Sequence, residues 1–309
     1  MSVIKKLTIV ESPYGGEFWL VDKDGVIHSE KMNVITEPRE VDDYENCGVY
    51  LKAGVPYERM DVPYEQREGE LPHQAIARGY SDACYQALTS GNVVLLAGGF
   101  CANNVGVLGG IQRAYGTDAK IGVVWLDAHT DASTPETTTT GLYNGMPVTT
   151  VLGQCLPDWA EDAGLEKSLE GKYMLMGDVR EAPEHNIQSL KASGVDIVGT
   201  EDFKKKGVWE DKVRALAEAV DVILLHVDMD VVPHAQRPSY PYPTEGGLDM
   251  NCVMAAVNST LKTGKVAAMT MFCVYFDEHL EGQEITNLNA MRMLAGALSH
   301  WKEYPEIEK

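Results

Sequence analysis

The chain has 309 residues, and its 46 acidic against 26 basic side chains give it a formal net charge of −20. Such a chain repels phosphate backbones, which argues against binding of nucleic acid through a basic surface. Hydrophobic residues make up 44% and charged residues 23%, a composition typical of a globular protein and not of a disordered one. We therefore expect a single domain over residues 1–309.

In chain order, the first features are a short apolar run and an acidic segment. The run at residues 7–10 is too short for a signal peptide, and no later run is as long as a membrane span. The six cysteines are far apart and include no CxxC pair, so neither a zinc ribbon nor a disulfide framework is predicted. These features predict a cytoplasmic protein with reduced thiols and no membrane partner. The acidic segment 40–45 is predicted to be a solvated loop.

Aliphatic runs without polar alternation follow, and they indicate strands of a parallel sheet that is covered on both faces. The predicted strands are residues 93–97, 121–126, 173–177, 195–198, 222–226 and 266–272. Helical patterns lie between and beyond them, at residues 74–88, 184–193, 209–220, 251–262 and 286–298. This alternation predicts a doubly wound α/β fold, in which functional side chains gather at the carboxyl ends of the strands.

Acidic and histidine residues follow two of these predicted strands in an alternating pattern. The first strand runs into Asp127, His129 and Asp131, and the second into His226, Asp228 and Asp230. Alternation along an extended chain places the members of each set on one side.

One such Asp-x-Asp sequence most often forms a turn or a helix cap. Two of them at neighbouring strand ends would repel each other unless cations neutralise them. Carboxylate and imidazole ligands suit manganese or another first-row divalent ion, and their density favours two ions over one. The sequence therefore predicts a binuclear metal site.

Four motifs in consistent order over roughly residues 70–300 resemble those of the arginases, members of the ureohydrolase superfamily. Residues 98–101 resemble the glycine-led first metal motif, and residues 127–147 the long metal and substrate loop. Residues 228–230 and 246–248 resemble the second aspartate motif and its glycine pair. The resemblance implies a three-layer α/β/α fold with a central, mostly parallel sheet, two manganese ions, hydrolysis of a guanidino or amidino carbon, and a homo-oligomer, either a trimer or a hexamer.

The resemblance also implies roles for the metal ligands. Asp127 and Asp228 would bridge both ions, and His129 and Asp230 would complete the second ion. Asp131 would hold the first ion, orient the hydroxide that bridges the metals, and pass its proton to the leaving nitrogen.

Cys101 stands where the family has a histidine ligand. As a thiolate it suits zinc, iron or nickel better than manganese, so these ions are alternatives. The other interpretation of Cys101 is a small buried residue beside a glycine turn. His226 stands where the family usually has serine; a satisfied core histidine is favoured, with a replacement ligand or a donor to a carboxylate as alternatives.

The substrate side of the resemblance is partly preserved. Ser133, Thr138 and Thr140 match positions that bind the carboxylate and amino group of the substrate, with a solvated turn as the alternative. Glu181 and Glu184 match the acidic positions facing them.

Three departures affect the same side of the site. Asn144 replaces a loop histidine and cannot titrate, and Tyr275 replaces the acidic residue that grips the guanidinium, with Asp277 as a substitute. Residues 233–234, Pro-His, replace the family's aspartate-proline.

Two functional hypotheses follow from these motifs. The first is a metal-dependent hydrolase of a guanidino or amidino, amino-acid-like small molecule, inefficient on L-arginine because of Asn144 and Tyr275. The alternative is an arginase-like protein that binds metal or ligand without ureohydrolase turnover.

Overall fold

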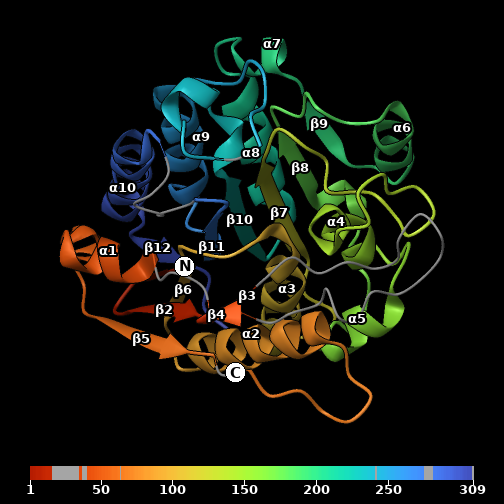
Figure 1. Cartoon of the computed structure of the whole chain (residues 1–309). Helices are drawn as coiled ribbons and strands as arrows, with labels where there is room; N and C mark the ends of the chain where they lie inside the picture. The colour runs from red at the N-terminus through yellow and green to blue at the C-terminus, as the bar shows by residue number, and fades with distance from the viewer. Residues whose placement is uncertain (16–34, 37–39, 63, 241, 275–280, 308–309) are drawn as a thin grey trace.

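The computed structural model describes residues 1–15, 35–36, 40–62, 64–240, 242–274 and 281–307. Its centre is an eight-stranded parallel sheet with the order β5-β2-β6-β11-β10-β7-β8-β9 (Figure 1). These strands are β2 (Leu7–Glu11), β5 (Tyr57–Asp61), β6 (Val93–Leu96), β7 (Ile121–Leu126), β8 (Met174–Gly177), β9 (Asp196–Val198), β10 (Val222–Asp228) and β11 (Val266–Phe272). Two short antiparallel pairs accompany the sheet, β1 (Ser2–Val3) with β12 (Glu303–Tyr304) and β3 (Tyr14–Gly15) with β4 (Ile35–Thr36).

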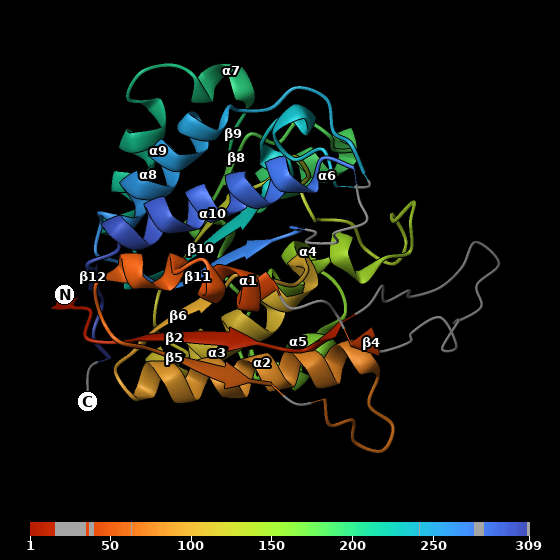
Figure 2. The same cartoon turned by 60° about the vertical axis from the view of Figure 1, so that its left-hand side comes forward.

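Helices cover both faces of the sheet, which gives three layers (Figure 2). One face packs against α8 (Val208–Ala219), α9 (Met250–Leu261) and α10 (Gln283–His300). The other packs against α2 (Pro72–Thr89), α3 (Asn104–Tyr115), α4 (Pro147–Val151) and α5 (Pro157–Asp162). The remaining helices are α1 (Glu40–Asn46), α6 (Glu184–Ala192) and α7 (Thr200–Phe203). The predicted α/β/α architecture is confirmed.

Alternation along the strands divides the hydrophobic core into two parts. In β6, Val93 and Leu95 belong to the part under α8, α9 and α10, whereas Val94 and Leu96 belong to the part under α2 and α3. Successive side chains of a strand point to opposite faces, so a continuous apolar run buries both. This double burial holds the strand ends in fixed positions.

Close packing of α2 on α3 depends on a glycine. A Cβ on Gly106 would lie 2.2 Å from the backbone oxygen of Ala77, so only a residue without a side chain allows this approach. The contact anchors α3, whose first turn follows the loop that carries Cys101.

The acidic segment 40–45 forms helix α1, so the prediction of a solvated loop was wrong. Tyr44 is buried in the core, and Arg59 Nη1 lies 2.6 Å from Asp42 Oδ1 and 2.9 Å from Glu45 Oε2. Two acids of the segment are thus paired with a residue of β5, which the local sequence does not reveal. Within the described ranges, no helix is long and apolar enough to cross a membrane.

Candidate metal centre

Four chain segments meet at the carboxyl ends of the central strands. Asp127 follows β7, and Asp228 ends β10, which lies beside β7 in the sheet. Cys101 begins a 3₁₀ turn in the loop after β6, and Cys273 directly follows β11. Open parallel sheets bind ligands at this edge, so the topology brings these side chains to the expected place.

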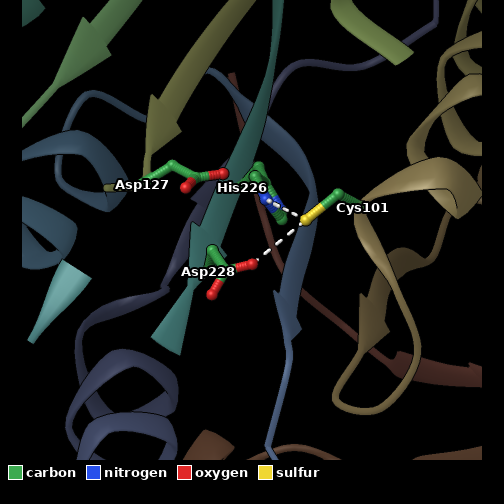
Figure 3. A group of neighbouring side chains, drawn as sticks. All are labelled: Cys101, Asp127, His226 and Asp228. Atoms are coloured by element: carbon green, nitrogen blue, oxygen red, sulfur yellow. Dashed lines mark hydrogen bonds between the residues drawn. The ribbon is translucent and has the colours of Figure 1, made fainter. Parts of the chain in front are cut away.

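The first group of ligand atoms comprises Cys101, Asp127, His226 and Asp228, all of them buried (Figure 3). Their ligand atoms lie within 4.8 Å of one another. Cys101 Sγ donates to Asp228 Oδ2 at 3.1 Å and lies 3.7 Å from His226 Nε2. We call these four residues the Cys101 group.

The second group comprises Asp127, His129 and Asp230, and we call it the His129 group. His129 Nδ1 lies 2.7 Å from Asp230 Oδ2 and 3.5 Å from Asp127 Oδ1. Asp127 belongs to both groups, so one carboxylate stands between two potential cation positions.

Hydrogen bonds from the protein fix the orientation of these carboxylates. Trp125 Nε1 donates to Asp127 Oδ2 at 3.0 Å, and the backbone N–H of His129 donates to Asp127 Oδ1 at 2.7 Å. The N–H of Asp230 donates to Asp228 Oδ1 at 2.7 Å. Such outer hydrogen bonds orient metal ligands before an ion arrives.

Asp131 lies beside both groups without belonging to either. Its backbone has a φ of 47°, in the left-handed region that aspartate adopts at some energetic cost. Its Oδ2 is buried and has no hydrogen-bond partner among the residues that the structure describes. A buried carboxylate oxygen without a donor costs free energy unless a cation or proton compensates it.

Burial and mutual repulsion raise the pKa of three of these carboxyls. Burial, followed by the charge of Asp230, raises the pKa of Asp127 to about 6. Burial and neighbouring carboxylates raise the pKa of Asp131 and Asp228 well above the ordinary value. Burial opposes the charged form of His129, but its hydrogen bonds to Asp127 and Asp230 outweigh this effect and raise its pKa to about 12.

The residues present fit divalent cations. Bound cations would compensate the charge of the three carboxylates with raised pKa values and would give the buried oxygen of Asp131 a partner. The convergent nitrogen and sulfur atoms would serve as further ligands. The oxygen and nitrogen ligands of the His129 group suit manganese, whereas sulfur in the Cys101 group suits a softer ion.

Two further residues join the site: His226, for which the sequence favoured a core histidine with a replacement ligand as an alternative, and Cys273, which the sequence did not single out. His226 is fully buried, and burial lowers its pKa to about 3, so its imidazole is neutral and able to bind metal. Cys273 is buried, has a φ of 60°, and lies close enough to Cys101 and Asp228 to affect the pKa of both groups. Its signal in the sequence is only its position after a hydrophobic strand.

Two arginines support Asp230 from outside the metal ligands. Arg180 Nη2 donates to the backbone oxygen of Asp230 at 2.7 Å. Arg237 is fully buried, and its charge contributes to a lowered pKa of Asp230, although burial opposes this and the hydrogen bond from His129 is the main lowering cause. Neither arginine follows a recognisable motif, so sequence reasoning missed both.

The predicted substrate residues lie at different distances from the metal ligands. Glu181 is close, with Oε2 3.9 Å from His129 Nε2, and its Oε1 accepts from the N–H of Glu245 at 2.9 Å. Ser133 Oγ lies 3.4 Å from Asn186 Nδ2, and the Oδ1 of Asn144 is buried without a partner in the described part of the chain.

Three further predicted positions are not linked to the metal ligands by the described contacts. Thr138 and Thr140 hydrogen-bond within their own turn, with 3.5 Å between their hydroxyl oxygens. Glu184 is exposed in the first turn of α6 and accepts from Gln188 at 3.2 Å. Tyr275 and Asp277 lie outside the described residues.

The chain is similar in sequence to several arginases. The chain is 28% identical to arginase-1 of Sus scrofa over 262 residues, which cover 80% of this chain and 77% of that protein. It is 26% identical to an arginase of Bacillus caldovelox over 63% of this chain and 66% of that protein, and an alignment with a Neurospora crassa arginase covers 62% of that protein.

Solved structures show the same fold. The Bacillus caldovelox arginase superposes with a TM-score of 0.76 at 22% identity, over 96% of this chain and 98% of that one. A formimidoylglutamase of Bacillus subtilis superposes with a TM-score of 0.69 at 19% identity, over 98% and 89% of the two chains. The family model described as "Arginase family" matches residues 29–299. The protein therefore belongs to the arginase family.

Proposed function

We propose that the protein is a metal-dependent hydrolase that cleaves a C–N bond at the guanidino or amidino carbon of an amino-acid-like substrate. The proposal rests on the two ligand groups that share Asp127 at the ends of β7 and β10. Divalent ions held there supply a water that is ionised near neutral pH and polarise the carbon under attack. Manganese suits the His129 group, and nickel, iron or zinc suits the Cys101 group.

Asp131 is the proton carrier in this proposal. Its Oδ2 is buried beside the ligand groups and is not engaged by any described donor, so it is available to a proton. A carboxyl of this kind accepts a proton from the attacking water and donates it to the leaving nitrogen. Asp131 has a left-handed backbone conformation, with a φ of 47°, in the loop that follows β7.

The amino-acid end of the substrate is proposed to bind on the exposed side of the His129 group. Glu181 presents a half-exposed carboxylate there and attracts a positively charged amino group. Ser133, Thr138, Thr140 and Asn144 offer hydroxyl and amide groups from the loop after β7, with Glu184 and Tyr275 as further candidates. A solved Entamoeba histolytica arginase of the same fold was crystallised with L-ornithine, which supports an amino-acid ligand in this type of site.

The test is a substrate screen with metal-loaded protein. Arginine, agmatine, guanidinobutyrate and formiminoglutamate are assayed for release of urea, ammonia or formamide. We expect turnover of at least one of these substrates and weak activity on arginine, because Asn144 cannot transfer a proton. Arginine turnover as fast as that of an ordinary arginase contradicts the proposed specificity, and a loaded protein inactive on every amidine contradicts the hydrolase.

Asn144 also favours a second candidate function, a metal- or ligand-binding protein of the same fold without turnover. Its amide does not titrate, so general acid catalysis from this position is absent. Calorimetric binding of amino-acid ligands to a metal-loaded but inactive protein is the result that this candidate predicts.

A cytoplasmic location, a homo-oligomeric state and a single domain are also proposed. All six cysteines are free thiols, which suits the reducing cytoplasm. Family resemblance suggests a homo-oligomer, either a trimer or a hexamer, and light scattering measures its mass directly. Residues 1–309 are proposed to fold as one domain, and the expected result is a single cooperative unfolding transition.

A further inference from the structure

The Cys101 group differs in chemistry from the metal ligands predicted by resemblance. The loop after β6 supplies sulfur where the family has an imidazole, and an imidazole arrives instead from within β10, at His226. The two changes occur at positions in contact, with Cys101 Sγ 3.7 Å from His226 Nε2 (Figure 3). One replaced ligand is thus accompanied by a new one directly beside it.

We propose that Cys101, Asp127, His226 and Asp228 form a four-ligand site for a thiophilic divalent ion of the zinc type. The inference rests on the metal centre of the proposed function but does not depend on turnover. It assigns His226 as a metal ligand and gives the two cation positions different selectivities.

The distance between the sulfur and the imidazole nitrogen of the group matches this assignment. With zinc–sulfur bonds of about 2.3 Å and zinc–nitrogen bonds of about 2.0 Å, sulfur and nitrogen in a tetrahedral site lie about 3.5 Å apart. The observed separation of Cys101 Sγ and His226 Nε2 is 3.7 Å. Cys101 Sγ lies 3.1 Å from Asp228 Oδ2, so binding of an ion between them requires loss of the thiol proton and a slightly wider separation.

His226 is also oriented as a ligand. Its Nδ1 faces away from the group, 2.8 Å from Thr270 Oγ1 and 3.1 Å from Asn104 Nδ2. The Thr270 hydroxyl donates to Asn104 Oδ1 at 3.0 Å, so its oxygen can accept a hydrogen bond from Nδ1–H. Asn104 Nδ2 can only donate, so it pairs with the other tautomer, in which Nδ1 is the acceptor. In the tautomer protonated on Nδ1, which metal binding requires, the lone pair of Nε2 faces Cys101, as in metal sites where the second ring nitrogen donates to an oxygen.

Packing holds the ring in this orientation. The sheet register places His226 opposite Trp125 of β7 and Thr270 of β11. The ring centres of Trp125 and His226 are 4.0 Å apart, and Phe272 lies on another side with its ring centre at 5.5 Å. A histidine that serves only to fill the core has no need of metal-ligand neighbours. His226 instead places a ring nitrogen within 4.8 Å of ligand atoms of one thiol and two carboxyls.

The test is cobalt substitution of metal-free protein, because cobalt replaces zinc and a cobalt thiolate gives a charge-transfer band in the near ultraviolet. We expect this band in the wild type and its loss in Cys101→Ser. Cys84→Ser, which removes a buried thiol of α2 outside the group, is the matched control and keeps the band. A wild type without the band, or a Cys101→Ser protein that retains it, overturns the proposal; so does loss of the band in Cys273→Ser when Cys101→Ser keeps it.

The role of His226 is tested by competition between the protein and a chromophoric chelator for zinc. His226→Ser is expected to weaken zinc binding by at least about 100-fold, and Thr270→Val, which leaves the imidazole in place, by about 10-fold. Unchanged zinc affinity in a folded His226→Ser protein overturns the assignment. If that variant does not fold, unchanged affinity in Thr270→Val overturns it. A protein that passes these tests but hydrolyses no amidine refutes the proposed function and not the site.

Discussion

The two ligand groups share Asp127 but differ in burial and in chemistry. Every member of the Cys101 group is buried, and two of its ligands are sulfur and an imidazole enclosed by aromatic rings. In the His129 group the imidazole side chain is 41% exposed and faces Glu181. The enclosed group is built by core strands and suits tight, selective binding of an ion, whereas the open group lies where a substrate can approach.

Loss of the shared ligand is expected to have the largest effect. In Asp127→Asn both groups lose a charged oxygen, so we expect undetectable turnover and no stabilisation by added metal. At a metal concentration of about 100 times Kd, the wild type is expected to gain about 3 kcal/mol in unfolding free energy. Thermal unfolding with and without cobalt or manganese measures this gain.

Asp118→Asn is the matched control, because it removes a fully exposed aspartate whose ion pair within the described residues is a 3.9 Å contact with Lys167. Equal metal-dependent shifts in Asp127→Asn and in this control contradict a shared ligand.

Removal of a ligand from the His129 group alone is expected to weaken one cation position and to leave the other intact. His129→Asn is predicted to lose one bound ion and to lower turnover on the order of 100-fold, because one of two cooperating charges is lost. The cobalt thiolate band is expected to persist. Metal analysis and absorption spectra of the same sample measure both, and disappearance of the band shows that the groups are not separate.

Replacement of the sulfur ligand of the Cys101 group by an imidazole is expected to change the choice of metal more than the stability of the protein. Cys101→His is predicted to raise the ratio of manganese to zinc affinity by about tenfold, since thiolate prefers softer ions. Competition titrations of the variant and the wild type give this ratio. An unchanged ratio indicates that Cys101 is not a ligand.

The smallest expected effect is the pH dependence of metal-free protein. The pKa of Asp127 is raised to about 6, so the carboxyl binds its proton more tightly in the folded protein than in the unfolded chain. This contribution is complete below the ordinary aspartate pKa and is lost as the pH rises through about 6.

Asp127 should therefore lower the unfolding temperature of metal-free protein by a few degrees between pH 4 and pH 7, at roughly 2 °C per kcal/mol for a chain of this size. The difference between the wild type and Asp127→Asn isolates this contribution, because the amide does not titrate and the other acids are common to both proteins. Equal changes of unfolding temperature in the two proteins contradict the raised pKa.

The sequence predicted β6 to β11, six of the eight strands, because burial on both faces leaves a local signal. Continuous apolar runs marked these strands, and alternating acidic and histidine residues marked the ends of β7 and β10. Strand β5, Tyr-Glu-Arg-Met-Asp, lacks such a run, and β2 was not predicted either. Helix α1 was missed because two of its acids pair with Arg59, a partner distant in sequence.

The chemistry of the enclosed group was only partly visible. His226 resembles a core histidine along the chain, and only the sheet register reveals Thr270 on one side and Cys101 on the other. Arg237 and Cys273 reach the site through tertiary packing that no local pattern encodes.

Equilibrium dialysis of metal-free wild-type protein tests the central claim most directly. Dialysis against cobalt, followed by metal analysis, counts the ions that each chain holds. We predict two ions per chain, one retained at lower free metal than the other, because the enclosed and open groups differ in ligands and exposure. Binding of no stoichiometric metal, or of a single ion, contradicts a centre built from two groups around Asp127.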